Sequence, residues 1–96
     1  MKTTAADLCA AIQNRQRVTF KYDGTMRLAE PYALGQTVEG VMTLRAWQNA
    51  GDGTGWRMFC VSRMACVEVT DLIFQSMRIS PDPTNQMFSM TICGLH

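Results

Sequence analysis

The sequence is poor in the residues that active-site chemistry usually requires. Its single histidine, His96, is the last residue, and its four cysteines form no Cys-x-x-Cys pair. A zinc site needs closely spaced ligand pairs, so we expect no metal ion and no cofactor. No apolar run reaches the roughly 18 residues that a membrane span needs, and no signal peptide is visible. These absences indicate a cytoplasmic protein without a membrane segment.

The acidic residues and glycines occupy structural positions. Asp7 falls at a predicted helix cap and Asp23 at a predicted turn, whereas Asp71 falls at a strand end. The glycine-rich segment 51–55 joins two predicted strands and opens no helix, so it does not resemble a phosphate-binding loop. Because no nucleophile lies beside a base, we expect that the protein is not an enzyme.

The four cysteines, Cys9, Cys60, Cys66 and Cys93, are interpreted as small buried hydrophobic residues, since Cys9 lies among alanine and leucine and two others fall in apolar strands. A disulfide framework is the alternative. A reducing cytoplasm favours free thiols.

Charge is nearly balanced, but the cations are mostly of one kind. The net charge of +1 excludes a strong, nonspecific binder of polyanions. Seven of the nine cations are arginine, whose planar fork of donors recognises phosphate and carboxylate groups. Arginines are interspersed with aromatic residues between positions 45 and 63, which indicates an anion-binding surface. We expect Glu30 to pair with Arg27 or a neighbouring arginine, and so to support the fold and not the ligand.

The chain of 96 residues predicts one domain, mainly β with one N-terminal helix. The Thr-x-x-Asp motif at residues 4–7 predicts the start of a helix over residues 5–14. Strands are predicted at residues 17–22, 25–30, 41–48, 56–61 and 65–70. Asp23-Gly24 predicts a type I′ hairpin turn, and Pro31 is expected to end the second strand. Residues 32–36 are either a connector or a short strand.

One helix followed by five short antiparallel strands predicts a small, strongly bent barrel. Alternation places Val18, Phe20 and Tyr22 on one face of the first strand. Trp47 is opposite in phase to the apolar residues of its strand, so we expect it to be exposed. For Phe59, packing in the core is favoured.

Residues 75–96 differ in their residue pattern from the rest of the chain, so we divide the chain into a domain over residues 1–74 and a C-terminal extension over residues 75–96. A Ser-Pro-Asp-Pro break at residues 80–83 precedes a segment of strand character at residues 87–93. This segment is either a sixth strand that covers a barrel edge or an arm that reaches a second subunit of a homodimer.

Several short motifs occur in an order that resembles the WYL domain, a small Sm-like barrel of bacterial and phage regulators. The matching motifs are Arg27 with Glu30-Pro31, Leu44-Arg45-Ala46-Trp47, Arg57-Met58-Phe59 and Arg63-Met64. The name-giving triplet falls at residues 42–44, where only Leu44 is retained. Cys60 and Ser62 stand where the family pattern has an arginine and an aspartate. The resemblance implies a five-stranded, antiparallel Sm-like small barrel.

The resemblance also implies a regulatory sensor that binds nucleic acid or a nucleotide-like ligand. We expect Arg27, Arg57 and Arg63 to meet the phosphates of single-stranded nucleic acid or of a nucleotide. Arg45 and Trp47 are expected to extend this surface, with bases stacked on the indole.

A protein-interaction or antagonist module is the alternative, for example a phage-encoded accessory protein. Eight methionines and the near-neutral charge favour it. No DNA-binding module is recognised in the sequence, so either role is expected of a freestanding sensor, a dimer, or a domain that docks to a partner protein.

Overall fold

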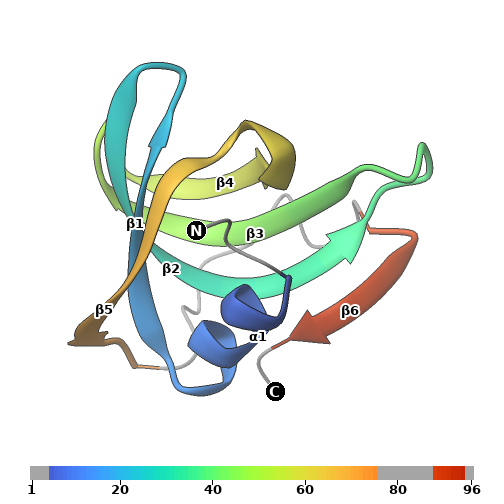
Figure 1. Cartoon of the computed structure of the whole chain (residues 1–96), viewed down its shortest axis with the longest axis horizontal. Helices are drawn as coiled ribbons and strands as arrows, with labels where there is room; N and C mark the ends of the chain where they lie inside the picture. The colour runs from blue at the N-terminus through green and yellow to red at the C-terminus, as the bar shows by residue number, and fades with distance from the viewer. Residues whose placement is uncertain (1–4, 76–87, 95–96) are drawn as a thin grey trace.

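The computed structural model describes residues 5–75 and 88–94, which form one helix, one short 3₁₀ turn and a single antiparallel sheet (Figure 1). In chain order the elements are α1 (Ala5–Gln13), β1 (Gln16–Tyr22), β2 (Thr25–Gln36), β3 (Met42–Ala50), β4 (Gly55–Cys60), η1 (Val61–Arg63), β5 (Ala65–Ile73) and β6 (Met90–Gly94). The prediction of a mainly β fold with one N-terminal helix is confirmed. The predicted helix cap at Thr4 lies outside the described residues.

The sheet is bent but open. Its strands follow the order β4-β3-β2-β1-β5, and β6 also pairs with β2. Figure 1 shows the sheet curling round, yet among the described residues no ladder joins the two end strands, β4 and β5. The predicted bending is present, whereas the predicted closure into a barrel is not observed. After β4, η1 leads the chain across to the free edge of β1, where β5 forms its ladder.

Strand β2 is twice as long as predicted because Pro31 does not end it. On one edge, β2 pairs with β1 through residues 25–29 and with β6 through residues 33–36. Pro31 falls in the gap between these two partners and beside a register shift in the ladder with β3. A proline lacks the N–H that a ladder needs, so it is tolerated where a ladder is already interrupted.

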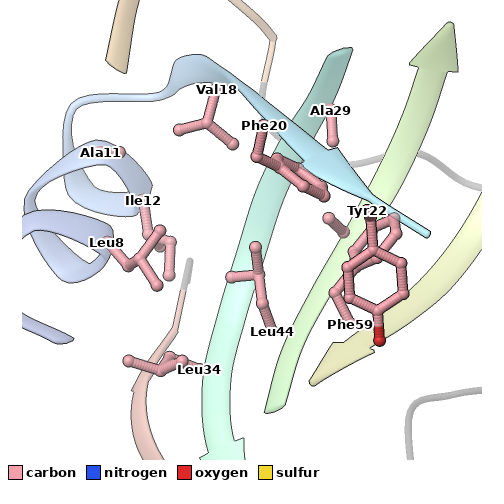
Figure 2. Packing of buried hydrophobic residues seen from close by; sticks show 11 residues of the cluster. Leu8, Ala11, Ile12, Val18, Phe20, Tyr22, Ala29, Leu34, Leu44 and Phe59 are labelled. Atoms are coloured by element: carbon pink, nitrogen blue, oxygen red, sulfur yellow. The ribbon is translucent and has the colours of Figure 1, made fainter. Parts of the chain in front are cut away.

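The hydrophobic core lies between α1 and one face of the sheet, which we call the core face (Figure 2). Its buried members are Leu8, Ala11, Ile12, Val18, Phe20, Tyr22, Ala29, Leu34, Leu44, Ala46 and Phe59. The rings of Phe20 and Phe59 meet edge to face, with centroids 4.8 Å apart. The predicted alternation of β1 and the predicted burial of Phe59 are both confirmed. α1 is amphipathic and short, so its stability depends on this packing.

A disulfide between Cys9 of α1 and Cys93 of β6 joins residues 84 positions apart in the sequence. Of the two remaining cysteines, Cys60 is half-buried and Cys66 is exposed. The interpretation of all four as unpaired buried residues is therefore wrong. Spacing along the chain could not reveal the pair, because only the pairing of β6 with β2 brings Cys93 to the helix.

Residues 90–94 form a sixth strand on the edge of β2 of their own chain, which is the first of the two alternatives predicted for this segment. The side-chain hydroxyl of Ser89 donates towards the carbonyl oxygens of Gln36 and Thr37, at 3.1 and 3.0 Å. These bonds and the disulfide attach β6 at both of its ends.

Candidate ligand-binding site

Tyr22 ends β1 and forms the centre of a cluster at this end of the sheet. Its side chain is 8% exposed, and its hydroxyl accepts a hydrogen bond of 3.0 Å from the backbone N–H of Cys60. The chain then reverses through Asp23 and Gly24, whose φ angles of 50° and 80° are both positive. This is the backbone that a type I′ turn requires, as the Asp-Gly pair predicts.

Arg27 lies on the core face and is only 9% exposed. One guanidinium nitrogen donates to Gln48 Oε1 at 3.1 Å, and the other donates to the Tyr22 carbonyl at 3.0 Å. The guanidinium carbon lies 5.7 Å from the centroid of the Tyr22 ring, within the range of a cation–π contact. Because both terminal nitrogens have internal partners, Arg27 is arranged to shape the cluster more than to meet a ligand.

Arg63 reaches the same ring from η1. Its guanidinium carbon lies 4.9 Å from the Tyr22 centroid, and one terminal nitrogen forms an ion pair with Asp23. The hydrogen bond that Arg63 donates to the Asp23 carboxylate is the main reason that the pKa of this guanidinium is raised above its ordinary value. Both side chains of the ion pair are 56% exposed. Arg63 therefore presents a fixed positive charge to solvent.

Arg57 of β4 packs against the glycine-rich loop 51–55 that joins β3 and β4. Its terminal nitrogens donate to the carbonyl oxygens of Trp56, at 3.0 Å, and Asp52, at 3.4 Å. A Cβ atom at Gly55 would lie 3.0 Å from the Arg57 guanidinium, so the loop follows this side chain closely.

The same loop also holds Arg27. The Gln48 side chain donates to the Gly53 carbonyl at 2.8 Å and accepts from Arg27, so it connects the loop to the buried guanidinium. A Cβ atom at Gly51 would lie 2.8 Å from Arg27 Cδ, which only a glycine avoids. Tyr22, Arg27, Arg57 and Arg63, with the loop 51–55, are called the Tyr22 cluster below.

Arg45 and Trp47 are not part of this cluster. Directly paired residues share a face of a sheet, and β3 pairs Arg45 with Met58 and Trp47 with Trp56. Their neighbours Leu44 and Ala46 are on the core face, so alternation puts Arg45 and Trp47 on the opposite face, which we call the outer face. Trp47 is half-buried and not exposed as predicted, because it meets Trp56 edge to face, with ring centroids 5.5 Å apart. The five predicted site residues are thus divided between two faces.

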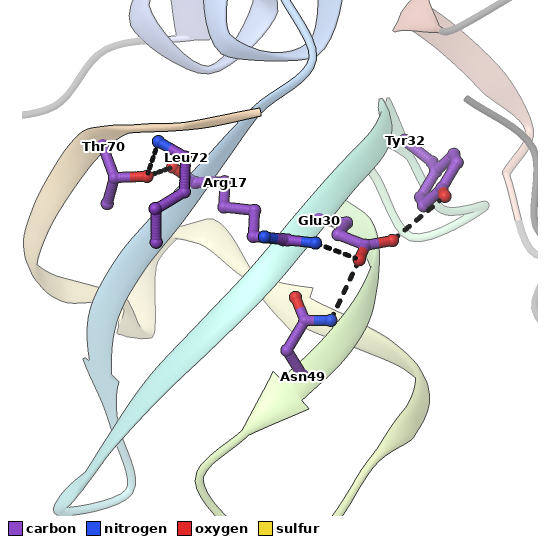
Figure 3. A network of polar contacts seen from close by, with 6 residues as sticks. All are labelled: Arg17, Glu30, Tyr32, Asn49, Thr70 and Leu72. Atoms are coloured by element: carbon purple, nitrogen blue, oxygen red, sulfur yellow. Dashed lines mark hydrogen bonds and ion pairs between the residues drawn. The ribbon is translucent and has the colours of Figure 1, made fainter. Parts of the chain in front are cut away.

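The outer face carries a second polar cluster around Glu30, which is 2% exposed (Figure 3). The Glu30 carboxylate accepts hydrogen bonds from Asn49 at 2.9 Å and Tyr32 at 3.1 Å, and it pairs with Arg17 at 3.4 Å. These four residues are called the Glu30 cluster. Glu30 pairs with an arginine as predicted, but the partner is Arg17 and not Arg27, whose terminal nitrogens bond to Gln48 and Tyr22.

Aromatic rings close the outer face over the Glu30 cluster. The Tyr32 ring lies 5.0 Å from Trp56 and 5.2 Å from Phe74, measured between centroids. Phe74 follows β5, is 2% exposed, and is held by a hydrogen bond from its N–H to the Arg15 carbonyl. The segment after β5 therefore helps to cover Glu30, whereas the Arg17 side chain remains 29% exposed. The buried carboxylate and its donors support the fold.

Sequence reasoning missed Tyr22 at the centre of the Tyr22 cluster, and Asp23, which pairs with Arg63 of this cluster. Tyr22 is readable only as a core-facing strand residue, and Asp23 only as a turn residue. The partner of Asp23 is 40 positions away, so no local pattern reveals the ion pair. The one usable signal is that a strand ending in tyrosine before Asp-Gly places a ring beside a turn.

Two further observations limit the chemistry of the described residues. They contain no group of three His, Cys, Asp or Glu side chains arranged to hold a metal ion. No helix within residues 5–75 and 88–94 is both long and apolar enough to cross a membrane.

Comparison with known proteins identifies the family. The family model of the WYL domain matches residues 3–69, which is more than half of the chain. No curated protein and no solved structure matches the chain. The match contains the Tyr22 cluster and ends within β5, so β6 lies beyond it. The chain belongs to the WYL domain family.

Proposed function

We propose that this WYL domain is a non-enzymatic sensor that binds single-stranded nucleic acid or a nucleotide at the Tyr22 cluster. Membership of the family suggests a regulatory or ligand-sensing module. The ligand class and the site are our proposal, and they rest on the arrangement of the arginines.

The observation that carries the proposal is the approach of two guanidiniums to one tyrosine ring. Arg27 comes from β2 and Arg63 from η1, and their guanidinium carbons lie 5.7 and 4.9 Å from the Tyr22 centroid. Neighbouring positive charges repel each other, so such a gathering favours an anion as the third component.

The two more exposed arginines of the Tyr22 cluster would contact the ligand. Arg57 is half-buried and Arg63 is exposed, and a guanidinium has five N–H donors, of which those to Asp23 and to backbone carbonyls use only a part. These two residues would hold phosphate groups, while Arg27 keeps the loop 51–55 in place. Arg45 and Trp47 would contribute only to a longer strand that passes round the β4 edge to the outer face.

A titration with matched variants tests the proposal. A short fluorescein-labelled oligothymidylate is titrated with the protein at low and at physiological salt, followed by fluorescence anisotropy. The variant Arg57→Ala/Arg63→Ala is expected to bind at least tenfold more weakly and to show a smaller dependence on salt.

The control removes two other arginines. In Arg15→Asn/Arg45→Ala the net charge falls by the same amount, and asparagine tolerates the positive φ of 54° at position 15. Equal losses in both double variants would mean that charge alone drives binding. A larger loss of affinity in the control would mean that the ligand binds on the outer face. No binding by the wild type at low salt would reject the proposed function.

Docking to a protein partner is the second candidate, because β5 exposes large apolar side chains at an edge of the sheet. Val69, Leu72 and Ile73 are 42%, 51% and 60% exposed. Unpaired edges of this kind invite strand addition. A stoichiometric partner that resists nuclease and is lost in Leu72→Lys/Ile73→Lys would favour this function.

We also propose that the protein acts in the cytoplasm and forms a homodimer, with a surface other than the paired strand β6. Light scattering on the purified chain measures the subunit number. The Cys9–Cys93 disulfide is of a kind that is rare in a reducing cytoplasm, so it argues against this location. The thiols are therefore counted in protein that is alkylated inside intact cells and then denatured, and a count of four would support the cytoplasm. Two reactive thiols would be found if Cys9 and Cys93 are bonded, and four if all are free.

A further inference from the structure

Asp23 holds the most exposed arginine of the Tyr22 cluster. Its carboxylate, at the tip of the β1–β2 turn, pairs with a terminal nitrogen of Arg63 while the Arg63 guanidinium lies over the Tyr22 ring. A carboxylate and a phosphate oxygen present the same kind of acceptor to a guanidinium. Asp23 therefore occupies the kind of position that a ligand's phosphate would take.

The ion pair is easily exchanged. Both side chains are 56% exposed, and ion pairs in contact with water contribute little to stability. The cation–π contact with Tyr22 does not involve Asp23, so the ring continues to orient Arg63 when the carboxylate leaves. A phosphodiester has the same single charge and two acceptor oxygens as a carboxylate, and a terminal phosphate has more of both, so either group can take the place of Asp23 at small cost.

We propose that Asp23 is an internal substitute for the ligand's phosphate. In the free domain the Asp23 carboxylate pairs with Arg63, and an incoming phosphate must displace it. This proposal rests on the proposed function, and it names Asp23 as the residue that sets the affinity of the site. The pair thereby limits binding to ligands whose phosphate competes with a carboxylate, and it keeps weaker anions out.

The turn allows a clean test of this role. Positions 23 and 24 have φ angles of 50° and 80°, and asparagine is at least as suitable as aspartate at the first of them. Asp23→Asn therefore keeps the fold, the size of the side chain and the turn, and it removes only the charge. Asp71→Asn removes one exposed charge near the opposite end of β1, where residue 73 pairs with Gln16, and serves as the control.

The experiment is a set of anisotropy titrations of the labelled oligothymidylate with wild type, Asp23→Asn, Asp71→Asn, Arg63→Ala and Asp23→Asn/Arg63→Ala, with inorganic phosphate as a competitor. Asp23→Asn is expected to bind about two- to fivefold more tightly than wild type, because Arg63 no longer has to exchange a partner. Asp71→Asn is expected to match wild type. The gain is expected to vanish in the Arg63→Ala background, since the carboxylate acts through this guanidinium.

Each other outcome overturns the proposal in a distinct way. Equal affinities of Asp23→Asn and Asp71→Asn would mean that only net charge matters. Weaker binding by Asp23→Asn would mean that the carboxylate positions Arg63 for the ligand. A gain that persists without Arg63 would separate Asp23 from this arginine. In all three cases wild type still binds, so the proposed function stands; if no variant binds, both proposals fail.

Discussion

The two polar clusters of this domain contain the same kinds of side chain but differ in how they are closed. The Glu30 cluster joins one carboxylate to three donors, is covered by Trp56 and Phe74, and leaves Glu30 2% exposed. The Tyr22 cluster has an excess of guanidinium groups and leaves Arg63 56% exposed. A closed cluster in which charge is matched supports the fold, whereas an open one with surplus charge of one sign is suited to a ligand.

The largest effect is expected from removing the centre of the closed cluster. Glu30→Ala leaves Arg17, Tyr32 and Asn49 without their common acceptor in a buried place, so we expect the free energy of unfolding to fall by about 3 kcal/mol. Urea denaturation measures this loss. Oligonucleotide binding by the folded variant should match wild type, and a binding loss as large as that of Arg57→Ala/Arg63→Ala would contradict the division of roles. Glu68→Gln, at an exposed position, is the control.

Arg27 belongs to both the fold and the open cluster, so its removal should affect both. Arg27→Ala leaves Gln48 Oε1 and the Tyr22 carbonyl without their donor, and we expect a loss of about 2 kcal/mol in urea denaturation together with weaker binding.

Arg27→Lys separates charge from shape, because lysine keeps the charge but cannot donate to both acceptors with a planar fork. We expect it to recover less than half of either loss. Full recovery of binding by lysine would mean that the charge, and not the support of the loop, is what Arg27 contributes.

Gly51 tests whether the loop depends on its close approach to Arg27. In Gly51→Ala the new Cβ would lie 2.8 Å from Arg27 Cδ and from the Met26 carbonyl oxygen, at a φ of +119°. We expect a loss of about 1–2 kcal/mol and weaker binding. Gly40→Ala also has a positive φ, of +80°, but meets nothing within 4 Å, so it measures the cost of the backbone alone. Equal losses in the two variants would show that the contact with Arg27 is unimportant.

The smallest effect on stability is expected at the open end of the Tyr22 cluster. Arg63→Ala removes an exposed ion pair and a surface cation–π contact, so the midpoint of urea denaturation should not change measurably. Binding of the labelled oligothymidylate should nevertheless weaken several-fold. A clear shift of the midpoint with unchanged affinity would mean that Arg63 supports the fold and does not bind the ligand.

Much of the fold can be read from local patterns. The helix at residues 5–13, the alternation of β1 and the Asp23-Gly24 turn depend on neighbours within a few positions, and these are the features that the sequence predicts well. The prediction fails at Pro31 and at the cysteines. Pro31 stays within β2 because β1 and β6 leave a gap on that edge, and Cys9 meets Cys93 because β6 pairs with β2. Both facts concern strands that are distant in the sequence.

The sequence by itself determined the family, the alternation of faces within each strand and the abundance of arginine, because these depend on residue type and spacing alone. Only the tertiary structure decided which arginines meet. Alternation along β3 sends Arg45 and Trp47 to the face opposite Leu44 and Ala46, whereas Arg27 of β2 and Arg63 of η1 converge on Tyr22 only because of how these elements pack. A strand presents alternate residues to opposite sides, so proximity in sequence separates side chains that only pairing between strands can bring together.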